Sequence, residues 1–561
     1  MIVTAHKGGV MHPTGFPLQA WLNRALVELP MGSLAQRLSI LNVLCDLASL
    51  ILLMRLLKLW EIPGVLMVIG AILFGFDTIL FSVSIYPEKY SMIVLSNLLL
   101  IFLHQLFFRS DSRKRNRIFL LFSLCIGLGL SQHTSLLAMA PLWLHLFHET
   151  VKQGELSPQR RLWHCALSVL CALAPPVLLY DSLVWLRTDS VWVDWGALRG
   201  PGDVLRHFLR ADFQYVGINP RGVTGHQIST LQYWWLYFSR EWNLLLLFVP
   251  LGIYGYVRQV GYRAIYLLLS MASVFTLLWI AYQEPTEMGA GYMERYLVLT
   301  LPFLVPFSVR GIGFLWKKVR YTTVRYAASG VIAACLIYGL PAKYACFEET
   351  DNNLIDVYRE LVKKELPPDA IYVTANDWEL FYGLPENGGY RFPVFDMMAF
   401  PWFARRTFPR LEPRLYRLIG KYDVKEPWSL DVLLQLAWEE GLTLASTDRE
   451  ALKGLRDGAH RKGLVWIAGK DRTGESAINM HDDLKEICEG IGRVRYQVPR
   501  QGGYFNKVLL GKIGESVAEI VRELNKASTL DGREAMSSLR RSIVPGVAPE
   551  TWRRRCEEAL K

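Results

Sequence analysis

Long apolar runs dominate the first 345 residues of the chain, and a more polar pattern replaces them afterwards. The runs approach the length of about twenty residues that carries a helix across the hydrocarbon core of a bilayer. They predict membrane-spanning helices at residues 38–57, 65–85, 91–108, 118–130, 135–146, 162–185, 234–256, 264–281, 296–315 and 326–340. Two of these segments are short, and the stretch LSQHTS between them marks either a re-entrant turn or the junction of two tilted helices. We therefore expect nine or ten spans.

The pattern from residue 346 onwards alternates short strands with amphipathic helices. Strands are predicted at residues 370–377, 392–398, 442–447, 463–469 and 493–498, with helices at 352–366, 430–441 and the C-terminal end. Interleaving of this kind is typical of an α/β domain. The expected fold class is a polytopic α-helical membrane protein with a C-terminal soluble α/β domain. Its parts are an outer loop at residues 1–37, the membrane bundle at 38–345 and the soluble domain at 346–561.

Basic residues in the short connections assign the two sides of the membrane. They occur in alternate connections, at Arg55, Lys58, Arg109, Arg113, Lys114, Arg115, Arg117, Arg160, Arg161, Arg258, Arg263, Lys317, Lys318, Arg320 and Arg325. By the positive-inside rule these connections are cytoplasmic. We therefore expect an integral membrane protein whose N-terminal tail, remaining connections and C-terminal domain lie on the outer side, which is periplasmic or luminal. Of the two, we expect the periplasmic side of a bacterial inner membrane. The net charge of +11 then reflects orientation, and no nucleic-acid partner is expected.

The stretch VMHPTGFPLQAW, residues 10–21, precedes the first apolar run. It contains a histidine, two prolines and a glycine, at His12, Pro13, Pro17 and Gly15. This composition predicts a rigid, non-helical turn in an outer loop. The tail is basic and no signal peptide leads it across the membrane, so we expect a further helix upstream of Met1.

Candidate functional residues come from connections on the outer side that are far apart in the sequence. They are His12, Glu88, Lys89, Tyr90, His133, Trp195, His207, Arg210, Glu287, Glu294 and Arg295. Arginine suits a phosphate because its planar guanidinium donates two parallel hydrogen bonds. A carboxylate at the membrane boundary suits a general base. Their convergence predicts a cleft at the membrane boundary for a lipid-linked, anionic substrate, with neither a metal nor a cofactor.

Each candidate also has a structural interpretation. The His12–Pro13 pair can serve the turn alone, Glu88 and Lys89 can form an interfacial ion pair, and His133 can satisfy backbone groups between two half-helices. Asp46, Asp77 and His104 lie within apolar spans, where a charge is expensive, so we expect them to face the bundle interior. The residues alone leave open whether these three contact substrate or form structural pairs.

Five stretches, in this order along the chain, together resemble a known family. They are VTAHKGGVMHPTGFPL (3–18), SIYPEKYSMIVLSN (84–97), GLGLSQHTSLLAMAPL (127–142), VDWGALRGPGDVLRHFLRADF (193–213) and MERYLVLTLPF (293–303). They are similar to segments of the transmembrane protein 260-like protein O-mannosyltransferases, which belong to the GT-C superfamily of membrane glycosyltransferases. The individual motifs are weak, and their order carries the resemblance.

The resemblance implies a sugar donor linked to polyprenyl phosphate, a hydroxyl acceptor such as Ser or Thr of a translocated protein, and no metal. It assigns catalysis to Glu88 and His12. Substrate binding falls to Pro13, Gly15, Lys89, Tyr90, His133, Trp195, His207, Arg210 and Arg295. One departure is that the family's acidic Asp-x-Gly-Glu motif would lie just upstream of Met1. A flippase for a lipid-linked precursor and an inactive membrane scaffold remain the alternatives.

Overall fold

A computed structural model describes residues 9–11, 16–32, 34–85, 88–152, 157–186, 198–209, 243–281, 295–344, 354–367, 369–373, 408–424, 428–448, 451–452, 455, 459–462 and 464–469. The chain divides into two units. One unit comprises residues 1–214 and 218–343, and the other comprises residues 215–217 and 344–561. Each unit is described by itself.

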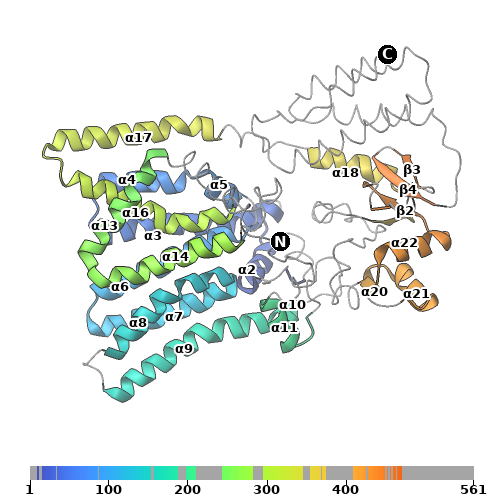
Figure 1. The fold of residues 1–561 in the computed structure, drawn as a ribbon, viewed down its shortest axis with the longest axis horizontal. Helices are drawn as coiled ribbons and strands as arrows, with labels where there is room; N and C mark the ends of the chain where they lie inside the picture. The colour runs from blue at the N-terminus through green and yellow to red at the C-terminus, as the bar shows by residue number, and fades with distance from the viewer. Residues whose placement is uncertain are drawn as a thin grey trace, which may run out of the picture. The chain divides into compact units, whose positions relative to one another are not determined.

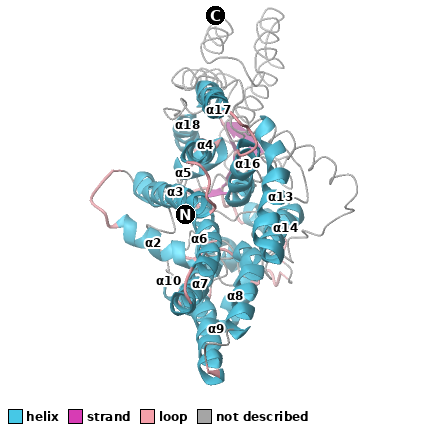
Figure 2. Cartoon of the chain, turned by 90° about the vertical axis from the view of Figure 1, so that its left-hand side faces the viewer, coloured by secondary structure: helices cyan, strands magenta, loops and turns pink. Residues whose placement is uncertain are grey.

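The first unit is a helical bundle (Figure 1). Its helices are α2 (Pro17–Val27), α3 (Leu34–Leu59), α4 (Gly64–Gly75), α5 (Thr78–Ile85), α6 (Tyr90–Arg109), α7 (Ser112–Gln132), α8 (Ala140–Lys152), α9 (Pro158–Asp181), α10 (Leu183–Leu186), α11 (Pro201–Phe208), α13 (Phe248–Val260), α14 (Ala264–Ala281), α16 (Leu301–Trp316) and α17 (Thr322–Tyr344). Short 3-10 turns lie at η1 (Thr134–Met139), η4 (Asn243–Leu247), η5 (Gly261–Arg263) and η6 (Val298–Thr300). Helices account for nearly all of the described part of this unit, and loops join them (Figure 2).

Helices α6 and α16 form the core of the bundle. In the most apolar windows of their segments, 67% and 94% of the residues are buried, against 17% for the segment that contains α9. The apolar side chains of α9 point outwards instead, as Leu162, Leu173 and Leu178 do. Exposed leucines along a helix are expected where lipid rather than water surrounds it. The first unit is therefore a membrane helical bundle.

Five segments of the described chain are long and apolar enough to cross a membrane. They are Leu34–Leu59, Tyr90–Arg109, Pro158–Leu186, Leu245–Leu278 and Arg295–Trp316. The sequence pattern predicts nine or ten spans, and part of the difference has a local cause. The segment expected at 65–85 is divided into α4 and α5, because Asp77 accepts hydrogen bonds from the amides of Ile79 (3.1 Å) and Leu80 (3.0 Å) and so begins a new helix. Asp77 is thus a structural cap.

The LSQHTS stretch joins two helices. Helix α7 ends at Gln132, His133 is extended, and η1 leads directly into α8. The His133 ring nitrogen Nδ1 accepts a hydrogen bond from the Ser135 amide at 3.1 Å, so His133 caps the start of η1. Of the two expected arrangements, the structure has the junction of two helices.

Glycines permit the closest helix crossings. A Cβ atom at Gly252 of α13 would overlap the carbonyl oxygen of Phe307 on α16, and one at Gly311 of α16 would overlap the carbonyl oxygen of Phe248. A Cβ atom at Gly127 of α7 would lie 2.7 Å from the carbonyl oxygen of Ala172 on α9. Small residues at such crossings let helix backbones approach each other in membranes.

The N-terminal stretch differs from its prediction in its second half. Val10 and Met11 are buried, and the Phe16 backbone is left-handed with φ 44°. Pro17 then occupies the first turn of α2, where its missing N–H is tolerated, so the expectation of a non-helical stretch is wrong from Pro17 onwards. The predicted outer loop at 1–37 likewise contains α2 and the first residues of α3. His12, Pro13 and Gly15 lie outside the described residues.

The described part of the second unit contains α18 (Leu354–Glu365), α20 (Phe408–Leu411), α21 (Pro413–Lys421), α22 (Leu430–Glu439) and a four-stranded sheet. The strands β1 (Ile371–Tyr372), β2 (Leu444–Ser446), β3 (Ala459–Lys462) and β4 (Val465–Ala468) have the order β1-β2-β4-β3. β1 is parallel to β2, and the other pairs are antiparallel. Strand β3 was not predicted. The strands expected at 392–398 and 493–498 and the C-terminal helix lie outside the described residues.

Candidate active site

A carboxylate and a guanidinium from distant parts of the chain meet at the start of α6. Glu88 lies in the connection between α5 and α6, and Arg295 begins the helical segment Arg295–Trp316. An Arg295 terminal nitrogen, Nη1, donates to Glu88 Oε1 at 2.6 Å, and the two side chains are 27% and 24% exposed. The pair is therefore partly open, and its second carboxylate oxygen has no hydrogen-bond partner among the described residues.

Lys89 follows Glu88 but turns into the protein, where it is only 5% exposed. Its ammonium lies 4.4 Å from the centre of the Phe16 ring, 5.1 Å from that of Tyr90 and 5.9 Å from that of Tyr296. Aromatic faces attract a cation, yet a buried charge is costly unless an opposite charge neutralises it. Among the described residues no carboxylate pairs with Lys89, so this ammonium is suited to receive an anion.

His133 and two glutamines connect the surrounding elements. The His133 ring stacks on Phe16 with centroids 5.6 Å apart and planes 7° from parallel. Gln19 of α2 donates to the Glu88 carbonyl at 2.9 Å, and Gln132 of α7 donates to the Gln19 side-chain oxygen at 2.7 Å. Both amides are buried. This network fixes the backbone of Glu88 to α2 and α7.

Tyr90 is the first residue of α6, and Asp46 of α3 contacts the next residue of that helix, Ser91. The Tyr90 ring meets Tyr296 edge-on at 5.2 Å. On α3, Asp46 accepts hydrogen bonds from the hydroxyls of Ser84 and Ser91, the latter at 2.9 Å. Asp46 thus faces the bundle interior, as predicted for an acid within an apolar span.

The structure brings together five of the sequence-predicted site residues: Glu88, Lys89, Tyr90, His133 and Arg295. His207 is fully buried on α11, which packs against α9. His104 lies in the C-terminal half of α6, and its Nε2 is 3.0 Å from Nδ1 of His145 on α8. His12, Pro13, Gly15, Trp195, Arg210, Glu287 and Glu294 lie outside the described residues.

Sequence reasoning did not single out Phe16, Gln19, Gln132 and Tyr296, although they form the walls of the site. Gln19 and Gln132 could have been noticed as amides beside apolar segments, where an unsatisfied polar group is expensive. Phe16 and Tyr296 carried no signal of their own, because single aromatic residues near membrane boundaries are common.

Comparisons with known proteins find relatives in the family that the five stretches resemble. Residues 1–155 match the family model of the protein O-mannosyl-transferase TMEM260 N-terminal domain. The chain is 25% identical over 401 residues to Protein O-mannosyl-transferase TMEM260 of Mus musculus, which covers 67% of this chain and 55% of that protein. It is also 25% identical over 301 residues to Protein O-mannosyl-transferase tmem260 of Dictyostelium discoideum, which covers 50% of this chain and 33% of that protein.

The chain therefore spans about half the length of the mouse relative and a third of that of the Dictyostelium relative. The family model includes Glu88, Lys89, Tyr90 and His133, and the longer alignments support the same relationship. Residues 1–155 are thus similar to the N-terminal domain of the TMEM260-like protein O-mannosyl-transferases, and the longer alignments extend this similarity over half to two thirds of the chain.

Proposed function

We propose that this chain is a membrane glycosyltransferase of the GT-C type that transfers mannose from a polyprenyl-phosphate donor to a Ser or Thr hydroxyl of a translocated protein. The names of the relatives support sugar transfer to protein, and the apolar helices support a membrane location. The proposal includes nine or ten spans, a C-terminal α/β domain and a periplasmic site in a bacterial inner membrane.

The observation that carries the proposal is the contact between Glu88 and Arg295, residues 207 positions apart that meet at the end of a central helix. In the proposed reaction the acceptor oxygen forms a bond to the anomeric carbon, and the bond from that carbon to the phosphate oxygen breaks. Glu88 takes the acceptor proton on the carboxylate oxygen that Arg295 leaves free. Arg295 holds the other oxygen and so fixes the orientation of the base.

Lys89 supplies the charge that the departing phosphate needs. Its buried ammonium has aromatic rings around it and no carboxylate partner among the described residues. A phosphate bound there would neutralise the ammonium, and the interaction would strengthen as negative charge develops on the leaving oxygen. We assign the neighbouring aromatic rings and His133 to the sugar, and we keep His12 as a catalytic candidate beside Glu88.

Mannosyl transfer in membranes containing the full chain tests the proposal. The donor is a radiolabelled polyprenyl-phosphate mannose, and the acceptor is a Ser/Thr-rich peptide. Glu88→Gln keeps the shape of the side chain and removes the base, so we expect transfer to fall by about 10²- to 10⁴-fold. Glu28→Gln is the matched control, because Glu28 is an exposed residue at the end of α2.

The control should retain the wild-type rate. Equal rates in the wild type and in a folded Glu88→Gln variant would refute the assignment of Glu88 as the base. Movement of the donor across the membrane without labelled peptide would favour the flippase alternative over transfer.

A further inference from the structure

A second polar site lies at the opposite end of α6 from Glu88. Helix α6 has 20 residues, which corresponds to about 30 Å along its axis. Around its last turn, a pocket of about 230 Å³ is lined by Trp60, His104, Gln105, Arg109, Tyr256 and Arg263, among others. This pocket is separate from the proposed transfer site.

The hydrogen-bond directions in the floor of the pocket can be assigned. The Trp60 indole N–H can only donate, and it lies 3.4 Å from Gln105 Oε1, which fixes the orientation of that amide. Gln105 Nε2 therefore donates to the Tyr256 hydroxyl at 2.7 Å and faces His104 Nδ1 at 3.0 Å. His104 then accepts on Nδ1 and donates from Nε2 to His145, as a neutral imidazole.

Tyr256 is left with a proton to donate. Its oxygen accepts from Gln105, its side chain is buried with 2% exposure, and no acceptor for its own O–H is found among the described residues. A buried hydroxyl that lacks an acceptor loses the hydrogen bond that water would otherwise give it. The pocket floor therefore offers a donor to a ligand.

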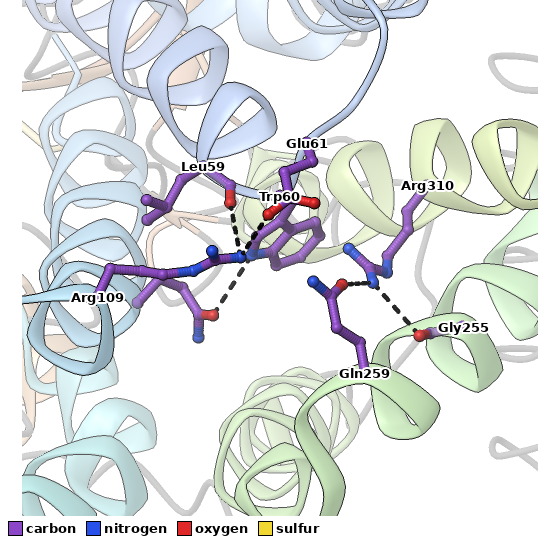
Figure 3. Close-up of polar contacts among 8 residues, drawn as sticks. Leu59, Trp60, Glu61, Arg109, Gly255, Gln259 and Arg310 are labelled. Carbon is purple, nitrogen blue, oxygen red and sulfur yellow. Dashed lines mark hydrogen bonds and ion pairs between the residues drawn. The ribbon is translucent and has the colours of Figure 1, made fainter.

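Arginines at the rim and behind the floor add further donors. Among the described residues, Arg109 donates through Nη2 alone, to Glu61 (3.1 Å) and the Leu59 carbonyl (3.4 Å), as Figure 3 shows. Arg263 contacts the Phe108 ring at 4.6 Å and has no carboxylate partner among the described residues. One acid against these two guanidiniums leaves an excess of positive charge.

Arg310 of α16 adds to the excess of positive charge, although it does not itself line the pocket. Its guanidinium lies 5.3 Å from the Trp60 ring centre and 5.4 Å from that of Tyr256, and it donates to Gln259 and the Gly255 carbonyl (Figure 3). The residue is only 8% exposed, and its Nε has no partner among the described residues. Among the described residues Glu61 acts on Arg310 electrostatically and no carboxylate forms an ion pair with it, and a buried guanidinium without an ion-pair partner favours an anion nearby.

We propose that this pocket binds a phosphate group at the basic end of the bundle. Phosphate accepts hydrogen bonds on every oxygen, which matches a pocket whose unsatisfied groups are donors. Basic pockets between membrane helices bind lipid headgroups. The C-terminal ends of α3, α6 and α13 carry unpaired carbonyl groups that disfavour an anion at this position. Arg109 and Arg310 offset this effect by donating hydrogen bonds to the Leu59 and Gly255 carbonyls.

Ligand-dependent thermal unfolding of the delipidated full chain in detergent tests the proposal. The three probes are phosphatidylglycerol, phosphatidylcholine and inorganic phosphate, and tryptophan fluorescence reports the midpoint at each probe concentration. Arg263→Gln removes a rim charge, and Tyr256→Phe removes only the hydroxyl. The matched control is Arg258→Gln, because Arg258 is exposed on the same stretch of chain, contacts Tyr254 and does not line the pocket.

We expect phosphatidylglycerol to stabilise the wild type and Arg258→Gln equally. The apparent dissociation constant should rise by about 10- to 100-fold in Arg263→Gln and Tyr256→Phe, since each loses a hydrogen bond to a charged group. The same selective loss with inorganic phosphate instead would support the pocket and assign it to a soluble phosphate. No stabilisation by any probe, or equal responses of Arg263→Gln and Arg258→Gln, would overturn the proposal.

Discussion

Replacement of Gly127 by alanine tests how closely α7 packs against α9. A Cβ atom at this position would lie 2.7 Å from the carbonyl oxygen of Ala172 and 2.8 Å from that of Cys171. Ordinary contacts between an aliphatic carbon and a carbonyl oxygen are about 3.3–3.6 Å. The two helices must therefore separate by roughly half an ångström to one ångström, and both obstacles are backbone atoms that no rotamer change can move.

The expected cost follows from two opposing terms. Overpacking of a well-packed contact costs about 1–3 kcal/mol, whereas alanine in a helix interior is favoured over glycine by about 0.5–1 kcal/mol. The central values of these two ranges leave a net loss of roughly 1 kcal/mol. At an unfolding entropy of about 2.1 cal/mol/K per residue, a bundle of this size would show a fall in the unfolding midpoint on the order of 1–2 °C.

Thermal unfolding of the detergent-solubilised full chain measures this loss. The matched control is Gly330→Ala on α17, where an added Cβ atom meets nothing within 4 Å. Its midpoint should stay the same or rise, because only the helix-propensity term remains. A Gly127→Ala midpoint equal to or above that of Gly330→Ala would refute the close crossing of α7 and α9.

Three further predictions concern the cap, the glutamine network and the lysine. Asp77→Ala should destabilise the chain by about 1–2 kcal/mol because α5 loses its cap. Asp111→Ala, at the exposed cap of α7, should cost less. Equal unfolding midpoints of the two variants would contradict the structural role of Asp77. Gln19→Ala should cost about 1–3 kcal/mol because it leaves the buried Gln132 amide nitrogen with only its 3.5 Å contact to the Lys89 carbonyl among the described residues. An unchanged midpoint would argue against the network. Lys89→Met should raise the KM for the lipid-linked donor about tenfold or more, since loss of a buried charge contact costs at least about 1.4 kcal/mol. The KM for the acceptor peptide should stay unchanged. A change in the acceptor KM alone would exclude the role of Lys89 in binding the phosphate.

The sequence predicts the elements that depend on local chemistry. Apolar length locates α3, α6, α9 and the segment that leads into α16, and short apolar stretches between helical segments locate β2 and β4. The helix break at Asp77 was missed because a single acid in an apolar run can either face the bundle or cap a helix, and hydropathy does not distinguish the two. The two prolines and the glycine of residues 10–21 predict a non-helical turn, whereas Pro17 lies in the first turn of α2, where a proline is compatible with a helix.

The candidate site was predictable in its charged members and not in its walls. Glu88 and Arg295 carry charge at expected membrane boundaries, so their convergence could be anticipated from topology. The environment of Lys89 could not be anticipated, because the sequence alone leaves open whether Lys89 forms an interfacial ion pair with its neighbour Glu88. In the structure Glu88 pairs with Arg295 instead, and the Lys89 ammonium lies against three aromatic rings. This arrangement depends on the tertiary positions of Phe16 and Tyr296.

A double-mutant cycle on mannosyl transfer tests the central claim, that Glu88 and Arg295 act as one unit in the reaction. The variants are Glu88→Gln, Arg295→Gln and the double variant, all in the full chain with polyprenyl-phosphate mannose and a Ser/Thr peptide. Residues that act together give non-additive losses, so we expect the double variant to be about as slow as the worse single variant, with a coupling of roughly 0.5–3 kcal/mol. Losses that multiply, or a folded double variant with the wild-type rate, would contradict the account.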